Sequence, residues 1–178
     1  MDAGQEQLLE ILKRESYVPG RVRLASGKES DFYIDVRKTA FLPEAASLIG
    51  EILYARLKAL ALDAVGGMAA GAIPLVDAVL HASLRGKAPI PGFFVRKAAK
   101  GHGLGKRVEG RFSKGDRVAI LEDVVTSGES SLGAAEAVEA EGGTVVLVLA
   151  LVDRLEGGRE AITARGYPFE TIFTRENF

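Results

Sequence analysis

The chain has 178 residues, 47% of them hydrophobic, and its 23 basic and 24 acidic residues leave a formal net charge of −1. These values predict one globular domain with a sizeable core, and they argue against a general nucleic-acid-binding surface. The lack of cysteine excludes disulfides, thiol catalysis and cysteine-ligated zinc.

No segment of the sequence predicts secretion or membrane insertion. The first residues, MDAGQEQLLEILKRES, are amphipathic and rich in acids, unlike a signal peptide. The longest apolar run, Val145–Val152, is too short to span a bilayer. We therefore expect a cytoplasmic protein that binds neither membranes nor nucleic acid.

Hydrophobic periodicity predicts the elements of the N-terminal part. An amphipathic helix is expected over Gln5–Glu15, followed by two short strands, Val22–Leu24 and Phe32–Val36, with a polar turn between them. Pro43 suits the first turn of a long helix that is expected over Glu44–Leu62. These segments predict a small N-terminal hood before the main body of the protein.

From residue 44 onward, apolar strands alternate with helices, and Val145–Val152 is the continuous apolar run typical of a strand covered on both faces. Further strands are expected at Ala64–Gly67, Phe93–Val95, Val118–Leu121 and Phe169–Thr174, and further helices at Leu75–Leu84, beyond Gly128 and at Gly158–Arg165. The alternation predicts an α/β fold with a mainly parallel central sheet flanked by helices. We expect a single domain over residues 1–178, with residues 1–40 as the hood and 41–178 as the core.

The segment Arg117–Ser131, RVAILEDVVTSGESS, predicts a strand, a tight turn and the start of a helix. This geometry directs backbone N–H groups and the positive end of a helix dipole at one place, where a phosphate can bind. The turn adds small donors suited to this role, Thr126, Ser127, Gly128 and Ser130. The adjacent carboxylates of Glu122 and Asp123 suit sugar hydroxyls or a metal beside that phosphate. A capped turn with exposed acids is the purely structural alternative.

Residues 96–111, RKAAKGHGLGKRVEGR, lack apolar periodicity and are expected to form a long loop with six basic residues, one histidine and one acid. The closely spaced Gly101, Gly103 and Gly105 predict a flexible loop at about residues 97–110. A basic loop in a nearly neutral protein suits a polyanion such as diphosphate. A solvated surface loop, or a patch that touches RNA, would have the same composition.

Three shorter strings suggest further ligand contacts. In LASGKESDFYIDVR, the aromatic pair Phe32 and Tyr33 would either flank a flat ring or lie in the core. The small residues of VGGMAAGAIP suit either a backbone loop around diphosphate or close packing of a helix on a strand. In LVDRLEGG, Arg154 would either clamp a carboxylate or form a surface ion pair with Asp153.

Several of these strings resemble one enzyme family. VAILEDVVTSG resembles the phosphoribosyl diphosphate (PRPP) motif of type I phosphoribosyltransferases, and FFVRKAAKGHGLGKRVEG resembles the catalytic loop of orotate phosphoribosyltransferases. LASGKESDFYIDVR, VGGMAAGAIP and LVDRLEGG resemble further segments of that family. The resemblance covers nearly the whole chain and implies the type I phosphoribosyltransferase fold. It also implies transfer of the 5-phosphoribosyl group from PRPP to orotate, which gives orotidine 5′-phosphate and diphosphate in de novo pyrimidine biosynthesis.

The resemblance assigns roles to matching positions. PRPP would be bound by Lys28, Arg96, Lys97, Lys100, His102, Glu122, Asp123, Val124, Val125, Thr126, Ser127, Gly128, Glu129 and Ser130. Orotate would be bound by Lys28, Phe32, Tyr33, Thr126 and Arg154. The catalytic residues would be Lys97, Lys100, His102, Glu122 and Asp123, and any of the first three is a candidate proton donor.

The resemblance also implies a metal and a partner. Mg²⁺ would be held mainly by oxygens of the substrate and of water, and Asp123 is the one protein side chain considered as a ligand. A homodimer is implied, because the loop at residues 97–110 would complete the site of the neighbouring subunit.

Two positions depart from the family pattern, and two other functions stay open. Ala98 stands where the loop usually carries an acid, and Ala70 stands where some members carry a lysine, which shifts diphosphate binding to the loop and Lys28. A purine phosphoribosyltransferase would share the PRPP motif, but the string RKAAKGHG and Arg154 argue against it. A non-catalytic PRPP-binding regulator would lose the loop or add a DNA-binding domain.

Overall fold

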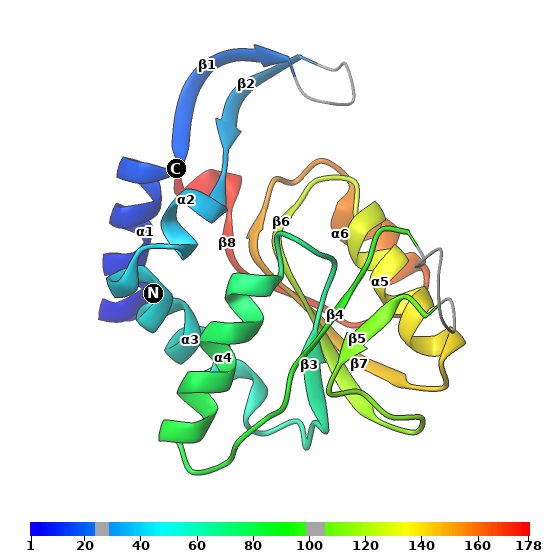
Figure 1. Ribbon diagram of the computed structural model, residues 1–178. Helices are drawn as coiled ribbons and strands as arrows, with labels where there is room; N and C mark the ends of the chain where they lie inside the picture. Colours follow the sequence, from blue (N-terminus) through cyan, green and yellow to red (C-terminus); the bar gives the residue numbers. More distant parts are fainter. Residues whose placement is uncertain (24–28, 99–105) are drawn as a thin grey trace.

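A central sheet of four parallel strands lies between two groups of helices, in the spatial order β3-β6-β7-β8 (Figure 1). The computed structural model describes residues 1–23, 29–98 and 106–178. The strands are β3 Ala64–Gly66, β6 Arg117–Val125, β7 Thr144–Asp153 and β8 Phe169–Thr174. The predicted α/β fold with a mainly parallel sheet is confirmed. Within the described ranges, no helix is long and apolar enough to cross a membrane.

Helices cover both faces of the sheet, because its strands alternate their side chains between two cores. On β6, Ala119 and Leu121 enter one core, while Val118 and Ile120 enter the other. The helices of the first face are α1 Ala3–Glu15, α3 Pro43–Leu57 and α4 Ile73–Arg85 (Figure 1). Those of the second face are α5 Glu129–Ala140 and α6 Gly158–Ala164.

Two antiparallel strand pairs extend this body. In the N-terminal hood, β1 (Tyr17–Arg23) pairs with β2 (Glu29–Ile34), and the hairpin projects away from the central sheet (Figure 1). Beside the edge strand β3, β4 (Phe93–Val95) pairs with β5 (Val108–Gly110). A final 3₁₀ turn, Arg175–Asn177, follows β8.

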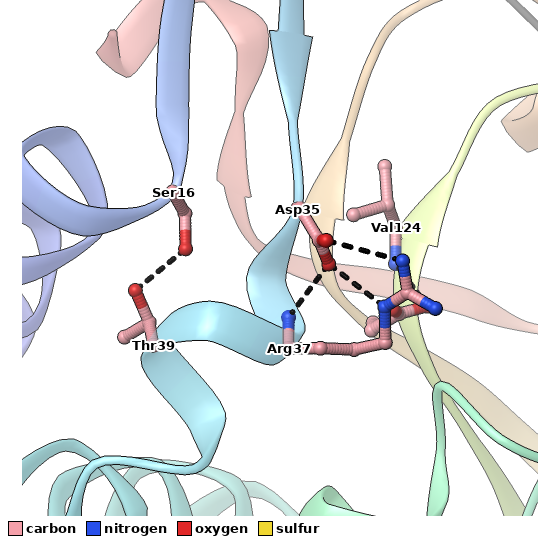
Figure 2. A network of polar contacts seen from close by, with 6 residues as sticks. Ser16, Asp35, Arg37, Thr39 and Val124 are labelled. Atoms are coloured by element: carbon pink, nitrogen blue, oxygen red, sulfur yellow. Dashed lines mark hydrogen bonds and ion pairs between the residues drawn. The ribbon is translucent and has the colours of Figure 1, made fainter.

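The chain leaves the hood through a short helix that the sequence did not predict. The expected strand Phe32–Val36 ends at Ile34, and α2 occupies Val36–Ala40. Asp35 stops the strand because its side chain caps the helix, accepting a hydrogen bond from the Arg37 backbone N–H at 3.2 Å (Figure 2). This helix contacts α3, α4 and β6, so it ties the hood to the core.

Two predicted boundaries differ from those in the structure. The long helix expected to reach Leu62 ends at Leu57, because Leu60 N–H donates to Leu57 O at 3.0 Å and Ala61 takes a left-handed φ of 49°. Glu122 and Asp123 were expected just after the strand Val118–Leu121. They lie within strand β6, because β6 stays paired with β7 as far as Val125.

The segment expected to be a continuous loop from 96 to 111 contains a strand. Val108 is buried and pairs with Val95, so β5 returns alongside β4. The strand forms because Val108 pairs with Val95, which lies 13 residues earlier in the chain. The segment itself has no apolar periodicity from which this strand could be predicted.

Candidate active site

A phosphate-binding geometry forms where β6 passes into α5. Gly128 is the N-cap of α5 with a φ of 81°, which few other residues adopt, and the helix N–H groups follow directly. A hollow of about 130 Å³ lies here, lined by residues 124–131 together with Glu122. Backbone N–H groups, the hydroxyls of Ser127 and Ser130 and the helix dipole can therefore act together on one anion.

The shape of this turn depends on a close contact with the start of α6. A Cβ added at Gly158 would lie 2.7 Å from the Thr126 carbonyl oxygen and 3.0 Å from the Gly128 nitrogen. A Cβ at Gly128 would in turn lie 3.0 Å from the Gly158 carbonyl oxygen. The turn is thus fixed by backbone packed on backbone, which only glycine at position 158 permits.

The two acids at the end of β6 have different surroundings. Glu122 is 4% exposed and its Oε2 accepts a hydrogen bond from the Ser131 hydroxyl at 3.1 Å. Burial, and then the negative charge of Asp123, raise the pKa of the Glu122 carboxyl well above its ordinary value. Asp123 is half-buried, and its Oδ1 accepts the Val124 N–H at 2.9 Å.

The small-residue loop between β3 and α4 reaches Asp123. A Cβ at Gly71 would lie 2.5 Å from Asp123 Oδ1, so the carboxylate rests against this loop. Gly66 packs directly on the ring of Phe93 and Gly67 on the backbone of Leu121, so close packing explains these two glycines. The peptide bond between Ala69 and Ala70 is cis.

Arg154 is buried at the end of β7. Its side chain contacts Glu156 Oε1 through Nε at 3.0 Å and through Nη2 at 2.8 Å, and its backbone N–H donates to Val125 O at 3.0 Å. Arg154 is 3% exposed and Asp153 is fully buried, so the alternative of a surface ion pair between them is wrong. The backbone bond to Val125 places Arg154 directly beside the phosphate turn.

The residues expected to contact a flat base divide between core and surface. Phe32 is 3% exposed and stacks on Tyr17, with ring centroids 5.8 Å apart. The Arg154 guanidinium lies over the Phe32 ring, 4.4 Å from its centroid. Tyr33, on the opposite side of β2, is exposed. Lys28 lies outside the described residues.

The base of the predicted catalytic loop faces the phosphate turn. Arg96 Nη1 contacts Glu109 Oε1 at 3.2 Å, and Arg107 Nε donates to the Arg96 carbonyl at 3.1 Å. Lys97 lines one groove of about 760 Å³ together with Ser127 and Ser130. The structure thus brings the loop base and the turn together, whereas Lys100 and His102 lie outside the described residues.

Sequence reasoning missed several polar residues of this region. Ser131 supports Glu122, Glu156 holds Arg154, and Asp35 binds Arg37 beside the end of β6. The pairings of Asp35 with Arg37 and of Arg154 with Glu156 had a local signal, namely opposite charges two residues apart at the end of an expected strand.

Named relatives align with almost the entire chain, although no family model matches it. The orotate phosphoribosyltransferase of Rhodopseudomonas palustris (strain BisB18) is 41% identical over 180 residues, which cover 99% of this chain and 96% of that protein. The orotate phosphoribosyltransferase of Sorangium cellulosum (strain So ce56) is 46% identical over 178 residues, which cover 98% and 92%.

Solved structures of a further relative agree with these alignments. Orotate phosphoribosyltransferase of Mycobacterium tuberculosis H37Rv, in complex with Fe(III) dicitrate, matches with a TM-score of 0.86 at 39% identity. The same enzyme in complex with PRPP matches with a TM-score of 0.83 at 35% identity. Each match covers 98% of both chains.

The parallel sheet, the phosphate turn and the acids beside it define a sugar-phosphate-binding protein with the type I phosphoribosyltransferase fold. Within this class, the chain belongs to the orotate phosphoribosyltransferase family. The fold and family predicted from the sequence motifs are confirmed.

Proposed function

We propose that this protein transfers the 5-phosphoribosyl group from PRPP to orotate, giving orotidine 5′-phosphate and diphosphate in de novo pyrimidine biosynthesis. The observation that carries the proposal is the likeness, over almost the whole chain, to enzymes named for this reaction. The purine alternative has no such support among these relatives. A cytoplasmic location is part of the proposal and is supported by the lack of cysteine in the sequence.

The phosphate turn would hold the 5′-phosphate of PRPP. The backbone N–H groups of residues 126–130 and the hydroxyls of Ser127 and Ser130 can donate to it. Glu122 lines the same hollow, so the ribose would lie next to it. The carboxyl of Glu122 and the carboxylate of Asp123 would then bind the ribose hydroxyls, with Val124 and Val125 forming the floor between them.

The reaction breaks the anomeric C–O bond and separates charge. Positive charge develops on the ribose ring, where the carboxylate of Asp123 can stabilise it. Negative charge leaves with diphosphate, which Arg96 and Lys97 would neutralise from the loop base. Lys100 and His102 would join them, a prediction that rests on sequence. The orotate ring nitrogen supplies the electron pair for the new bond, and because orotate is already anionic no strong general base is required.

Mg²⁺ fits this site as a metal bound mainly through the substrate. Asp123 presents a half-exposed carboxylate next to Gly71 of the loop between β3 and α4. A carboxylate oxygen in this position is a suitable ligand for Mg²⁺. Among the residues that the structure describes, no three His, Asp or Glu side chains gather closely enough to hold a metal by themselves. When bound, the ion would offset charge on the diphosphate oxygens.

Orotate would bind between the phosphate turn and the hood. Arg154 can bind its carboxylate bidentately, since the Glu156 side chain that holds it is 27% exposed and can yield a contact to the ligand. Phe32 lies beneath the guanidinium, so we assign it the support of Arg154 and not direct stacking on the base. Tyr33, Thr126 and Lys28 stay as predicted base contacts.

A homodimer would bury an exposed apolar surface beside α4. Phe41, at the turn between α2 and α3, is 74% exposed, and Ile73 is also exposed. Both line a groove of about 500 Å³ between α4 on one side and the turn from α2 into α3 on the other. Pairing of two copies through this face would remove apolar area from water and would let each loop at 97–110 approach the neighbouring site.

Steady-state assays with PRPP and Mg²⁺ test the reaction. Product should form with orotate and not with adenine, hypoxanthine or uracil. Lys97→Ala should abolish product formation while PRPP binding survives, and Lys58→Ala, at an exposed lysine of α3's C-terminal end, should leave both unchanged. Equal rates with a purine would overturn the assignment, and PRPP binding without any product would favour the regulator.

Mixing two inactive variants tests the shared site. If the loop of one subunit completes the other's site, Lys100→Ala and Arg154→Ala subunits should regain activity when unfolded together and refolded as mixed dimers. No recovery, with dimers present by analytical ultracentrifugation, would contradict the shared site.

A further inference from the structure

An arginine that no sequence motif marks lies on α2, beside the end of β6. Arg37 Nε donates to Asp35 Oδ1 at 2.8 Å and Arg37 Nη2 donates to Asp35 Oδ2 at 3.1 Å, which makes a bidentate pair (Figure 2). The Arg37 side chain is 51% exposed and that of Asp35 is 17% exposed. The carboxylate therefore fixes the direction of a guanidinium that still faces solvent.

The location of Arg37 is set by three packed elements. The short helix that carries it contacts α4, which follows the small-residue loop at 66–72, and β6, on which Gly67 of that loop packs. Asp123, at the end of β6, rests against Gly71 of that loop. Bonding to Asp35 is the main cause of the raised pKa of the Arg37 guanidinium, and the charge of Asp123 also contributes, which places Arg37 within electrostatic range of Asp123.

The loop at 66–72 carries no charge, so a nearby cation would be needed to neutralise a diphosphate bound there. The residues Gly66-Gly67-Met68-Ala69-Ala70-Gly71-Ala72 are all neutral. A diphosphate placed on this loop would meet the negative charge of Asp123 at close range. Arg37 lies within electrostatic range of Asp123 and can offset that charge, and a guanidinium has more N–H donors than the carboxylate of Asp35 can accept.

We propose that Arg37 is a donor-binding residue whose guanidinium, held by Asp35, binds the diphosphate group of PRPP above the neutral loop at 66–72. This inference rests on the proposed transfer from PRPP. It assigns to α2 the positive charge that the loop itself lacks. Asp35 acts as a positioning residue, because it holds the guanidinium in one direction before the donor arrives and so reduces the entropy lost on binding.

The test compares ligands with and without diphosphate. In Arg37→Ala, calorimetry should show PRPP and free Mg²⁺–diphosphate binding at least tenfold more weakly, because a charge-assisted bidentate contact is lost. Orotidine 5′-phosphate, which has no diphosphate, should bind within about threefold of the unmutated protein. Lys38→Ala, the next residue on the same helix and also exposed, is the matched control and should change neither affinity.

The conservative variants separate binding from folding. Arg37→Lys should recover part of the diphosphate affinity, and Asp35→Asn should weaken it while thermal unfolding stays close to that of the unmutated protein. Equal weakening of diphosphate and orotidine 5′-phosphate, or no change in either, would overturn the role of Arg37. Failure of the unmutated protein to form product would instead overturn the proposed reaction, since the binding comparison does not require turnover.

Discussion

The phosphate turn and the hood bound the same binding region but are held in different ways. At the turn, the backbone of Gly158 lies directly on the backbone of Thr126 and Gly128. In the hood, a 2.6 Å hydrogen bond joins the side chains of Ser16 and Thr39, and the ring of Tyr17 stacks on Phe32 and on the C-terminal Phe178. Where backbone packs on backbone, a single added methyl group displaces the site. Where side chains make the contacts, losing one of them should lower stability by a smaller amount and leave the site in place. Four substitutions test this difference.

The largest effect is expected at Gly158. Gly158→Ala places a methyl group against Val125 and Thr126, so the turn must shift. We expect kcat/KM to fall about a hundredfold, because displacements near 1 Å at a reacting site cost that much. The free energy of unfolding should fall by about 1–3 kcal/mol. Gly4→Ala in α1, where the new Cβ finds ordinary contacts, should leave kcat/KM unchanged.

Arg154→Lys should give the next largest effect. Lysine keeps the charge but loses the planar fork that meets Glu156 and would meet orotate. We expect KM for orotate to rise about tenfold to a hundredfold with KM for PRPP nearly constant. Arg175→Lys changes the other, exposed guanidinium over Phe32 and should raise KM for orotate less than threefold. An equal rise of KM for orotate in Arg154→Lys and Arg175→Lys would contradict a specific role of Arg154 in binding orotate.

Glu122→Gln should lower activity and raise stability. The amide retains a contact with Ser131 but has one carbonyl oxygen in place of two carboxyl oxygens, so a contact to the ribose hydroxyls is lost and kcat should fall about tenfold. Burial and the neighbouring Asp123 raise the pKa of Glu122 in the folded protein, and therefore the folded state binds more protons than the unfolded state between the ordinary value of 4.5 and the raised one. Stability consequently falls as pH rises through that interval and stays reduced above it.

Thermal unfolding from pH 5 to 8 checks the stability part. The Glu122→Gln protein should melt about 2–4 °C above the unmutated protein at the alkaline end for each kcal/mol gained, and the gap should narrow toward acid. Glu160→Gln, at an exposed position of α6, should give a curve parallel to that of the unmutated protein. A constant gap for Glu122→Gln would contradict the raised pKa.

The smallest effect on activity is expected in the hood. Ser16→Ala leaves the buried Thr39 hydroxyl without the partner it has at 2.6 Å, and should cost about 1 kcal/mol of unfolding free energy. The double change with Thr39→Val should cost less than the two single changes added together. We expect kcat/KM to stay within twofold, and a drop as large as that of Gly158→Ala would mean that the hood is as tightly coupled to the turn as α6 is.

Much of the site is readable from local sequence, and the remainder is not. The string LEDVVTSGES carries the strand, the turn and the helix start within consecutive residues, so the phosphate geometry follows from short-range rules. Arg154 likewise follows an apolar strand directly. The burial of Phe32 was an even choice, because an aromatic residue in a hairpin has no local signal that separates core from binding surface.

The amino-acid order alone determined the parallel α/β fold, the strand–turn–helix that suits a phosphate and the family to which the chain belongs. Tertiary structure decided that Glu122 is buried while Asp123 faces Gly71, that Gly158 shapes the turn, and that Arg37 lies within electrostatic range of Asp123. Periodicity and turn chemistry act between near neighbours and are therefore written in the sequence. Burial, electrostatic fields and close backbone contacts join segments far apart in the chain, so they exist only once the chain has folded.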